Sequence, residues 1–396
     1  MTLSVIIVSY NVRHYLAQCL WSVERAIQGI DADVWVVDNA STDDSVAYLQ
    51  AHFPWVHLIA NADNRGFARA NNQAISACAG RYVLLLNPDT VVGEDVLRTC
   101  VRFLDEHPEA GATGVRMLNS NGVFARESRR GLPTPLTSLY KMSGLCALFP
   151  RSRRFGHYYM GYLKEDEANR IEVMSGAFCM LRREALDQVG LLDEDYFMYG
   201  EDIDLSYRLL QGGWQNWYLP VRILHYKGES TQKTSYRYVQ IFYDAMLIFF
   251  NKHFARRYWL SAIVIRLGVR LRAACAYAGR ALCRWRRRVC RWLHADRLTS
   301  ETHADPESLF FFGSDEAWQA LQEVARRANL VAQRADEGQP IEALSEANYL
   351  VFDPSAYPYR HILDIVADQP ESRRRSYFGF FSAEHPELIL PYDIFE

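Results

Sequence analysis

The chain has 396 residues, which is long enough for two domains that each bury a hydrophobic core. Its composition, 49% hydrophobic and 23% charged, is that of a globular protein. The eight cysteines form no CxxC pair and no window contains 18 consecutive apolar residues, which argues against a disulfide scaffold and a membrane span. The net charge of −3 is unevenly distributed, because residues 256–297 contain twelve arginines and one acidic residue.

The first 120 residues alternate short apolar runs with amphipathic stretches. Nearly continuous apolar runs are typical of parallel strands buried on both faces. This βαβ alternation predicts an α/β fold with a mostly parallel sheet, helices on both faces and right-handed crossovers. Ser-Thr-Asp-Asp at 41–44 offers an N-cap for the second helix. Strands are expected at 4–10, 33–39, 55–61 and 81–87, and helices at 12–29, 42–52 and 66–79.

The later part of the chain is organised less regularly. Residues 120–170 are basic and loop-rich, without clear periodicity. We then expect a strand at 171–182, a helix at 201–211, strands at 214–220 and 222–226, and an amphipathic stretch at 235–253. From Ser308 a strand, a Gly-Ser turn and a helix begin a small Rossmann-like α/β domain of unknown role. We therefore divide the chain into a first domain (1–254), a basic amphipathic helical segment (255–298) and the small domain (299–396).

Polar residues follow each of the four early strands. Ligands of open parallel sheets bind beyond the carboxyl ends of the strands, where these residues are expected to meet. Asn and Asp are also common in ordinary turns, but four such strand ends at one rim favour a pocket for a polar, charged ligand. The four strand ends are Ser9-Tyr10-Asn11, Asp38-Asn39, Asn61 to Arg65 and Asn87-Pro88-Asp89.

Five motifs in chain order resemble those of the family 2 inverting glycosyltransferases, which have the GT-A fold, and are most similar to the bacterial rhamnosyltransferase-like members. The motifs are VIIVSYN, VVDNASTDDS, NRGFARANN, LLLNPDT and YGEDIDLSYRL, and the resemblance covers about residues 3–250. It implies transfer of a sugar from a nucleotide-sugar donor to a hydroxyl of a lipid-linked or saccharide acceptor during cell-envelope polysaccharide assembly. A UDP-sugar and a dTDP-sugar are equally possible donors, because uracil and thymine present the same edge.

The resemblance places the nucleotide at the ends of the first three strands. Asp38 is expected to bind the nucleotide base, and Ser9 and Tyr10 to line the site for base and ribose. Asn64 and Arg65 are expected near the nucleotide, where arginine suits phosphate oxygens.

A divalent cation is expected at the end of the fourth strand. Asp89 occupies the second acidic position of the family's Asp-X-Asp metal motif. The first position is Asn87, which lacks the carboxylate but whose side-chain carbonyl can still contact ribose or metal-bound water. Mn²⁺ or Mg²⁺ at Asp89 would neutralise the departing diphosphate. His225 resembles the late histidine that completes the metal shell in several GT-A enzymes, although a purely structural histidine is the alternative. Lys227 and Ser230 are alternative contacts for the diphosphate.

Inversion requires a base that removes the proton of the acceptor hydroxyl. The resemblance assigns this role to Asp202 of the Glu-Asp pair, with Glu201 orienting it or contacting the acceptor. Acidic residues also gather at helix N-termini because of the helix dipole, and this explanation is preferred for Asp204, a helix-cap or surface acid. The small residues of 174–178 are expected to let the backbone approach the donor sugar.

The arginines of residues 256–297 alternate with Trp, Leu, Ile and Val, as in a helix that lies on an anionic membrane surface. A helix packed on a domain and a nucleic-acid contact are the alternatives, but no other part of the chain resembles a nucleic-acid module, so no nucleic-acid partner is expected. No signal peptide is expected either. The enzyme would thus be cytoplasmic, peripheral on the inner face of the cytoplasmic membrane. A nucleotidyltransferase and a catalytically silent sugar- or membrane-binding adaptor with the same fold are the alternative functions.

Overall fold

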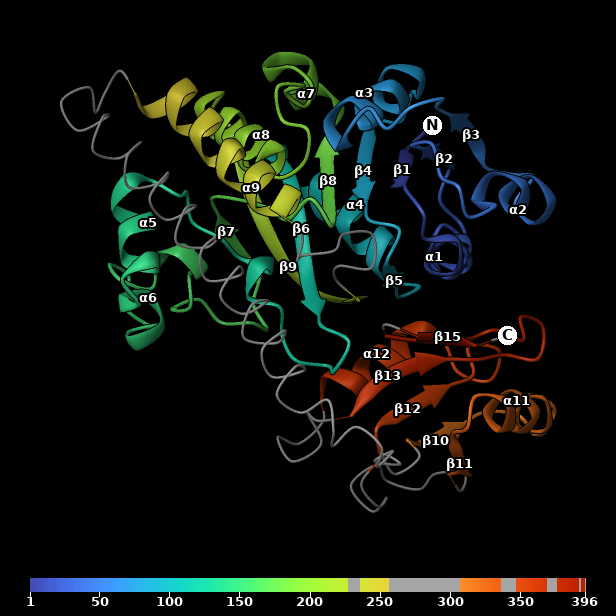
Figure 1. Cartoon of the computed structure of the whole chain (residues 1–396). Coiled ribbons are helices and arrows are strands. Elements are labelled where there is room, and N and C mark those ends of the chain that lie inside the picture. Colours follow the sequence, from blue (N-terminus) through green and yellow to red (C-terminus); the bar gives the residue numbers. More distant parts are fainter. Residues whose placement is uncertain (227–235, 256–306, 336–346, 369–375, 392, 396) are drawn as a thin grey trace, which may run out of the picture.

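The computed structural model describes residues 1–226, 236–255, 307–335, 347–368, 376–391 and 393–395. Two sheets organise these residues (Figure 1). The first sheet contains nine strands from residues 3–225, and the second contains six strands from residues 308–395. The basic segment predicted at 255–298 lies outside the described residues, apart from Ala255.

The first four strands are parallel, as the sequence predicts, and the structure arranges them in the order β3-β2-β1-β4. In this register Ser9 lies opposite Asp38, and Asp38 lies opposite Ala60, so the polar strand ends meet at one edge. The strands are β1 (Leu3–Ser9), β2 (Ala32–Asp38), β3 (His57–Ala60) and β4 (Tyr82–Leu86), and the helices between them are α1 (Arg13–Ala26), α2 (Ser45–His52) and α3 (Phe67–Ala77). The N-cap of α2 is Asp44, within the predicted capping stretch, but it forms no side-chain cap hydrogen bond.

Helices cover both faces of this sheet, as predicted. Strand β1 is completely buried, and its side chains alternate between two hydrophobic clusters. Leu3, Val5 and Ile7 pack with residues of α1 and α4 (Val96–Glu106). On the other face Ile6 and Val8 pack with residues of α3, α7 (Arg183–Val189) and α8 (Glu201–Gln211). The helices thereby hold the strand ends at fixed positions.

The second half of the sheet is mixed. Strand β8 (Phe178–Arg182) is antiparallel to both β4 and β6 (Ala110–Leu118), whereas β6 and β9 (Gln215–His225) are parallel. The short strands β5 (Thr90–Val92) and β7 (Asn169–Ile171) pair antiparallel with β9.

Two expectations for these strands were wrong in detail. The single strand expected at 171–182 is two strands, β7 and β8, because the chain turns in the small residues between them. The two strands expected at 214–220 and 222–226 are one strand, β9. Its pairing with β6 shifts register between Leu219 and Arg222, and this irregularity accommodates Pro220, which has no N–H to donate.

Residues 128–163 extend from the edge of the first sheet, and we call them the excursion (Figure 1). This region was expected to be loop-rich, yet it contains α5 (Pro135–Met142), α6 (Leu145–Leu148) and the 3-10 turn η2 (His157–Tyr159). These helices are too short for a periodic pattern to identify them. Helix α5 has a standard start, because the Thr134 hydroxyl accepts a hydrogen bond from the Thr137 N–H at 3.2 Å and Pro135 occupies the first turn.

After α8 and β9 the chain forms α9 (Tyr236–Phe249), which continues as a π-helical turn over Phe250–Phe254. Buried aromatic residues of this region, Phe249, Phe250 and Phe254, pack in a cluster with Tyr196 and with residues of α8. The helix therefore covers α8, the helix that begins with Glu201 and Asp202.

The second sheet has the order β11-β10-β12-β13-β14-β15. Its first four strands are parallel and the last two are antiparallel additions. The predicted strand, Gly-Ser turn and helix are present, and the Ser314 hydroxyl caps the helix by accepting from the Ala317 N–H at 3.2 Å. The elements are β10 (Ser308–Phe312), α11 (Asp315–Arg327), β11 (Val331–Arg334), β12 (Tyr349–Phe352), α12 (Tyr359–Ala367), β13 (Tyr377–Phe380), β14 (Leu388–Leu390) and β15 (Asp393–Phe395).

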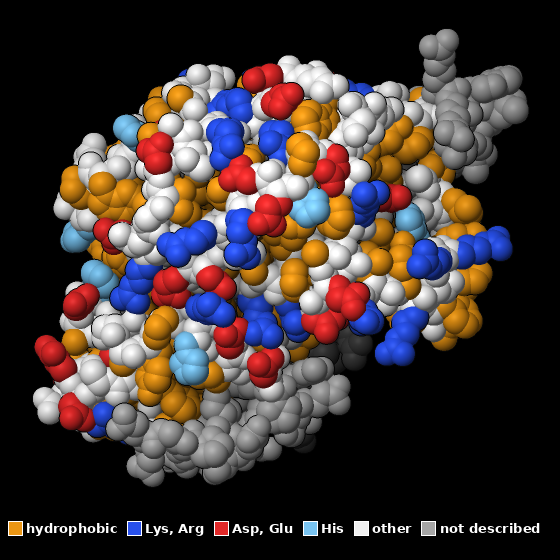
Figure 2. Space-filling model, turned by 180° about the vertical axis from the view of Figure 1, so that it is seen from behind, with side chains coloured by type: hydrophobic (Ala, Val, Ile, Leu, Met, Phe, Trp, Pro, Cys, Tyr) orange, Lys and Arg blue, Asp and Glu red, His pale blue; other side chains and the backbone are white. Residues whose placement is uncertain are grey.

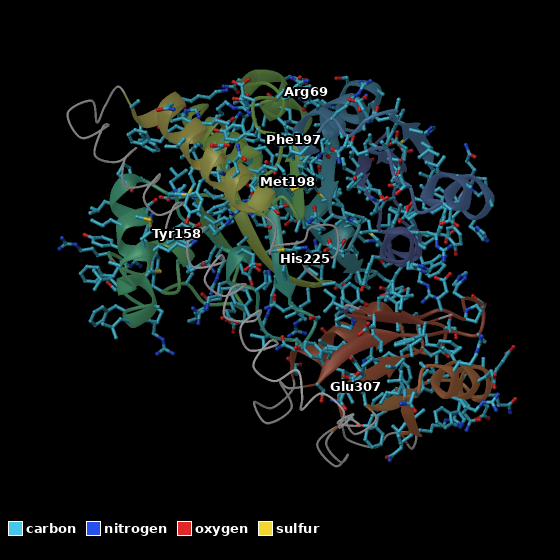
Figure 3. The ribbon with its side chains drawn as sticks, viewed as in Figure 1. Arg69, Tyr158, Phe197, Met198, His225 and Glu307 are labelled. Carbon is cyan, nitrogen blue, oxygen red and sulfur yellow. The ribbon has the colours of Figure 1, made fainter. Side chains whose placement is uncertain are left out.

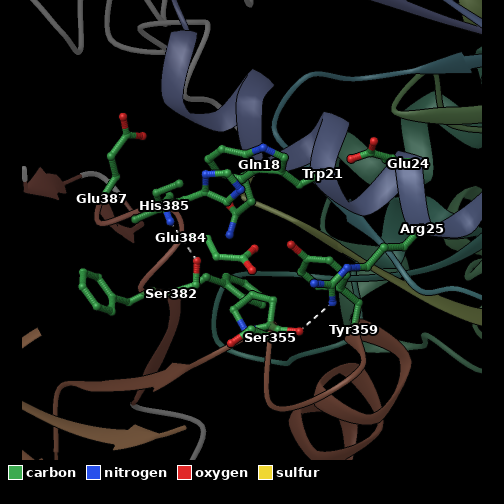
Figure 4. A pocket seen from close by; sticks show the side chains of 14 residues that line it. Gln18, Trp21, Glu24, Arg25, Ser355, Tyr359, Ser382, Glu384, His385 and Glu387 are labelled. Carbon is green, nitrogen blue, oxygen red and sulfur yellow. Dashed lines mark hydrogen bonds between the residues drawn. The ribbon is translucent and has the colours of Figure 1, made fainter. Parts of the chain in front are cut away.

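The two sheets share one hydrophobic cluster. Val91, Leu224 and Tyr226 of the first sheet region pack in the same cluster as Phe352 and Phe378 of the second. Polar contacts surround this cluster and connect α1 with the C-terminal residues. A pocket lies at this boundary between α1 and the loops that follow β12 and β13 (Figure 4).

Within this boundary the Trp21 ring stacks on the His385 ring at a centroid distance of 3.7 Å. The Arg25 guanidinium donates to the Pro354 carbonyl at 2.6 Å, and the Tyr15 hydroxyl donates to the Leu390 carbonyl at 2.9 Å. These contacts combine stacking with directed hydrogen bonds, so they fix the orientation of the second sheet on α1.

Glu94 provides the N-terminal cap of α12 from the other sheet. Its two carboxylate oxygens accept hydrogen bonds from the N–H groups of Tyr359 and Arg360, each at 2.8 Å. The N-cap residue of α12 is Pro358, which has no side-chain acceptor of its own. Because Glu94 follows β5 closely, this cap connects the C-terminal domain to the strand that begins at Thr90.

We expect Glu94→Ala to lower the free energy of unfolding by about 1–2 kcal/mol, because two helical N–H groups lose a charged acceptor. Glu94→Gln should have an intermediate effect, since its carbonyl still accepts one hydrogen bond. Urea denaturation measures the change. Asp187→Ala, at an exposed position of α7, is the control, and a loss of the same size in both variants would contradict the capping role.

Candidate active site

The carboxyl ends of β1 and β2 present two buried polar atoms to the rim. The Asp38 Oδ2 atom accepts a hydrogen bond from the Ser41 N–H at 2.9 Å. The Asp38 Oδ1 and the Ser9 Oγ are buried and form no hydrogen bond with the described residues. Buried polar atoms of this kind are rare unless a ligand or water completes them. Tyr10 follows Ser9 directly, and its side chain is 40% exposed.

A network of side-chain amides shapes the neighbouring turn. The Asn39 Nδ2 donates to the Asn64 Oδ1 at 3.1 Å and to the Gly66 carbonyl at 3.2 Å. The Asn39 Oδ1 accepts from the Arg65 N–H at 3.1 Å, and the Asn64 Oδ1 also accepts from the Gly66 N–H at 3.0 Å. The side-chain oxygen of Asn64 therefore accepts hydrogen bonds within the turn and fixes the backbone of residues 64–66.

This turn packs against the loop that leads into α8. Gly66 has φ +82°, and a Cβ atom there would lie 2.5 Å from the Phe197 carbonyl oxygen. The Phe67 N–H donates to that same oxygen at 2.8 Å. The side chain of Arg65 is 46% exposed at the outside of the turn, with its Nε 3.4 Å from Asp63. The rim at the ends of β1 and β2 is thus continuous with the loop of Phe197 (Figure 3).

The structure brings Asn87, Asp89 and His225 together. Strand β5 pairs antiparallel with β9 so that Thr90 lies opposite His225. The His225 Nε2 is 3.4 Å from the Asp89 Oδ1 and 3.4 Å from the Asn87 Nδ2. The Asp89 side chain is only 2% exposed. An imidazole and a carboxylate therefore lie side by side at the end of the strand.

The described residues contain no group of three or more His, Cys, Asp or Glu side chains arranged to hold a metal ion. A cation at Asp89 and His225 would therefore take its remaining ligands from phosphate oxygens and water. Mn²⁺ fits such a mixed set, because it accepts imidazole as well as carboxylate ligands.

Asp202 is fixed by a partly buried arginine, Arg130, that the sequence analysis did not identify. The Arg130 Nη2 donates to the Asp202 Oδ2 and also to the Met174 carbonyl. Burial lowers the pKa of Arg130, but the charge and hydrogen bond of Asp202, together with the contributions of Tyr158 and Glu127, raise the pKa overall. The Asp202 Oδ2 also accepts from the Gly176 N–H at 3.2 Å, and the Oδ1 accepts from the Ile203 N–H at 2.8 Å. No motif pointed to Arg130, because its only signal was its place in a basic, loop-rich region.

The turn of small residues at 175–177 connects Asp202 with the segment of Asp89. The Asn87 N–H donates to the Ala177 carbonyl at 3.0 Å, just after β4. On its other side the turn donates the Gly176 N–H to Asp202. A Cβ atom at Gly176 would lie 3.6 Å from the Asp202 Cβ, so the backbone of the turn lies close to the Asp202 side chain. One short turn therefore sets the position of Asp202 relative to the Asn87–Asp89 edge.

Glu201 is buried, and one of its carboxyl oxygens, Oε2, has no hydrogen-bond partner among the described residues. Burial and then the charge of Asp202 raise the pKa of Glu201 to about 8. Glu201 is therefore predominantly protonated at neutral pH and is a weak candidate for a base, whereas Asp202 is placed to accept a proton.

Asp204 is not the cap or surface acid that the sequence suggested. It is completely buried, and its carboxylate lies 2.7 Å from the Arg208 Nε and 2.6 Å from the His253 Nε2. The expectation was wrong because the chain after α9 folds back over α8 and brings His253 to this position. The pKa of Asp204 is affected most by burial, which raises it, but the hydrogen bonds from His253 and Arg208 lower it overall.

Comparisons with known proteins agree with the fold and the motifs. Residues 4–190 match the family described as glycosyl transferase family 2. An N-acetylglucosaminyl-diphospho-decaprenol L-rhamnosyltransferase from Mycobacterium tuberculosis is 29% identical over 260 residues, covering 62% of this chain and 83% of that protein. A low-salt glycan biosynthesis hexosyltransferase from Haloferax volcanii is 28% identical over 210 residues, covering 52% and 61%.

Among solved structures, a mannosyltransferase from Pyrobaculum calidifontis in complex with GDP-Man and Mn²⁺ aligns with a TM-score of 0.44 and 18% identity. The alignment covers 82% of this chain and 80% of that chain.

We expect Glu201→Gln to become more stable than the wild type as the pH rises from 4.5 to about 8. Over this range the wild-type carboxyl retains its proton in the folded state, where its pKa is about 8, but loses it in the unfolded state, where the ordinary value of 4.5 applies. The wild type therefore loses stability with rising pH, whereas the amide does not titrate. Urea denaturation across this range measures the difference. Glu184→Gln, at an exposed position, is the control, and a pH-independent difference for Glu201→Gln would contradict the burial of a neutral carboxyl.

Proposed function

Because the chain belongs to glycosyl transferase family 2, with an inverting glycosyltransferase domain that includes residues 4–190, we propose that it transfers a sugar from a UDP- or dTDP-sugar to a hydroxyl of a lipid-linked or saccharide acceptor. The product would belong to a cell-envelope polysaccharide. A lipid-linked acceptor is supported by the similarity to the mycobacterial rhamnosyltransferase, whose name includes a diphospho-decaprenol substrate.

One arrangement carries this proposal. The rim of the first sheet places the unsatisfied Asp38 Oδ1 and Ser9 Oγ at the ends of β1 and β2, and Asp89 follows β4 at the same edge of the sheet. Uracil and thymine both offer an imide N–H, which a buried carboxylate oxygen accepts well. The turn at 175–177 then connects the end of β4 to Asp202. The sites for the nucleotide base, the diphosphate and the proton of the acceptor hydroxyl would thus follow one another along the rim.

Asp202 would act as the general base. Its Oδ2 accepts hydrogen bonds from Arg130 and from the Gly176 N–H. The carboxylate has further lone pairs, which can accept a hydrogen bond from the hydroxyl of the sugar acceptor. As the hydroxyl oxygen bonds to the anomeric carbon and the bond to the diphosphate oxygen breaks, Asp202 takes the hydroxyl proton. The positive charge of Arg130 keeps the carboxylate oriented before the reaction. Glu201, protonated at neutral pH, would contribute shape or a hydrogen bond rather than proton removal.

Asp89 and His225 would hold the divalent cation, with Asn87 beside them. When bound, Mn²⁺ or Mg²⁺ supplies positive charge against the departing diphosphate. The pair fits a cation because a buried carboxylate oxygen and an imidazole nitrogen face each other at 3.4 Å. The loss of a carboxylate at Asn87 leaves the pair with a single negative charge, so metal binding should depend strongly on the donor diphosphate.

Membrane association is a further part of the proposal. Within the described residues, no helix is both long and apolar enough to cross a bilayer. We propose that the arginine-rich residues 256–297 lie on an anionic membrane surface and place the enzyme at the inner face of the cytoplasmic membrane.

Asp202→Asn should reduce turnover by about 10²-fold or more and leave donor binding nearly unchanged, because the amide keeps the shape of the base but accepts no proton. Transfer assays with an excess of donor measure turnover, and calorimetry with the donor nucleotide measures binding. Asp187→Asn on α7 should behave as the wild type. Transfer by Asp202→Asn at the wild-type rate would remove this residue from the mechanism.

Asp89→Ala should weaken the binding of UDP or dTDP in the presence of Mn²⁺ by about tenfold or more, because the cation loses its only carboxylate ligand from the rim. Calorimetric titrations with and without Mn²⁺ isolate the metal-dependent part. Binding in the absence of Mn²⁺ should be similar in both proteins. If the mutant retained the full Mn²⁺ effect, the cation would bind elsewhere.

A further inference from the structure

The excursion is strongly basic. Between Ser128 and Leu163 the sequence contains six Lys and Arg residues and no Asp or Glu, although the whole chain has a net charge of −3. A stretch of this length without any acidic residue creates a local positive potential.

Large hydrophobic side chains are exposed in the same region. Five of the ten exposed large hydrophobic side chains among the described residues lie within 136–149. Their exposed fractions range from 44% to 69%. Single exposed apolar residues are ordinary, but a cluster of them marks an interaction surface. The five residues are Leu136, Leu139, Met142, Leu148 and Phe149.

The apolar residues of α5 share one face of the helix. Leu136, Leu139 and Met142 are spaced three residues apart, whereas Thr137 and Tyr140 on the other side are buried against the protein. Helix α5 therefore exposes an apolar face, whereas a helix that only supports a core buries its apolar face. Its outward face is the one that needs a partner.

Exposed arginines follow the apolar residues directly. Arg151, Arg153 and Arg154 are exposed, and none of them forms an ion pair with the described carboxylates. The Arg154 Nε donates to the Tyr140 hydroxyl at 3.1 Å, and the Arg153 guanidinium lies 5.2 Å from the centroid of the Tyr162 ring. In Figure 2 this part of the molecule lies on the right, where blue and orange side chains are adjacent. These contacts tie two of the arginines to Tyr140 and Tyr162 of the same excursion.

We propose that this surface, which we call the docking face (Leu136, Leu139, Met142, Leu148, Phe149, Arg151, Arg153 and Arg154), binds the surface of an anionic phospholipid bilayer. The apolar side chains enter the boundary between headgroups and acyl chains, and the arginines bind lipid phosphates. Exposed leucines distinguish this surface from a nucleic-acid site, which relies on basic and aromatic groups without an aliphatic face. The docking face belongs to a different part of the sequence from the arginine-rich residues 256–297.

The excursion connects the docking face firmly to the candidate base. Arg130 belongs to the excursion and donates to Asp202. The Leu132 N–H donates to the Glu172 Oε2 at 2.6 Å, and the His157 Nε2 lies 3.0 Å from the same oxygen. Tyr158, which Figure 3 labels in this region, lies next to these residues in the chain. Bilayer binding at the docking face would therefore set the height of Asp202 above the membrane, which suits an acceptor whose lipid part remains in the bilayer.

Vesicle binding by the full-length protein tests the docking face without any assay of activity. We compare the wild type with Leu136→Gln/Leu139→Gln/Leu148→Gln in sedimentation with vesicles of phosphatidylcholine and phosphatidylglycerol. The partition coefficient of the triple variant should be lower by about tenfold or more, because three side chains no longer enter the interface. Residues 256–297 are unchanged in this variant, so the loss measures the docking face alone.

Val331→Gln/Tyr377→Gln is the matched control, because both residues are exposed hydrophobic residues of the C-terminal domain. It should bind vesicles as the wild type does, and equal thermal unfolding midpoints would verify that all variants are folded. Unchanged vesicle binding of the triple variant, or an equal loss in the control, would overturn the proposal.

A second pair of measurements tests the arginines. Arg151→Ser/Arg153→Ser should lower binding to the anionic vesicles severalfold, with a smaller effect at high salt. A single-stranded oligonucleotide serves as the competing probe. If the substitutions reduced oligonucleotide binding and left vesicle binding intact, the surface would be a nucleic-acid site and the lipid proposal would be wrong.

Discussion

The ion pair between Arg130 and Asp202 determines how the parts of this protein are assembled around the candidate site. It joins the excursion to the first turn of α8, and Arg130 also holds the Met174 carbonyl beside the turn at 175–177. A largely buried ion pair loses much of its Coulombic gain to desolvation, so it persists only when further hydrogen bonds complete both groups. Here the Gly176 N–H completes the carboxylate. The geometry of the proposed base is therefore set by three segments that are far apart in sequence.

The second sheet has a comparable effect on the opposite side of the site. Asp89 and His225 lie at the ends of β5 and β9, and their neighbours Val91, Leu224 and Tyr226 pack into the hydrophobic cluster shared with the C-terminal domain. The same strand pair therefore carries the proposed cation ligands on one side and core residues on the other. The C-terminal domain stabilises the edge that would hold the diphosphate, whatever other role it has.

Much of this architecture could be predicted from the sequence. The apolar runs located β1 to β4 within a few residues, because strands buried on both faces contain almost no polar residues. The parallel arrangement then required that Ser9 and Asp38 meet at one edge, as the register shows. The approach of Asp89 to His225 was expected only from the family resemblance, since 136 residues of chain separate them and no local pattern relates them.

What the sequence by itself determined is the order of the early elements and the chemical character of their ends, because hydrophobic periodicity and turn chemistry act over a few neighbouring residues. Only the tertiary structure decided which long-range partners those ends acquire. Arg130 had no local signal, Asp204 became buried because α9 folds back over α8, and Glu201 became neutral because packing removed water from its carboxyl. Burial and charge pairing depend on segments that meet in space, and these effects set the protonation and orientation of each acid.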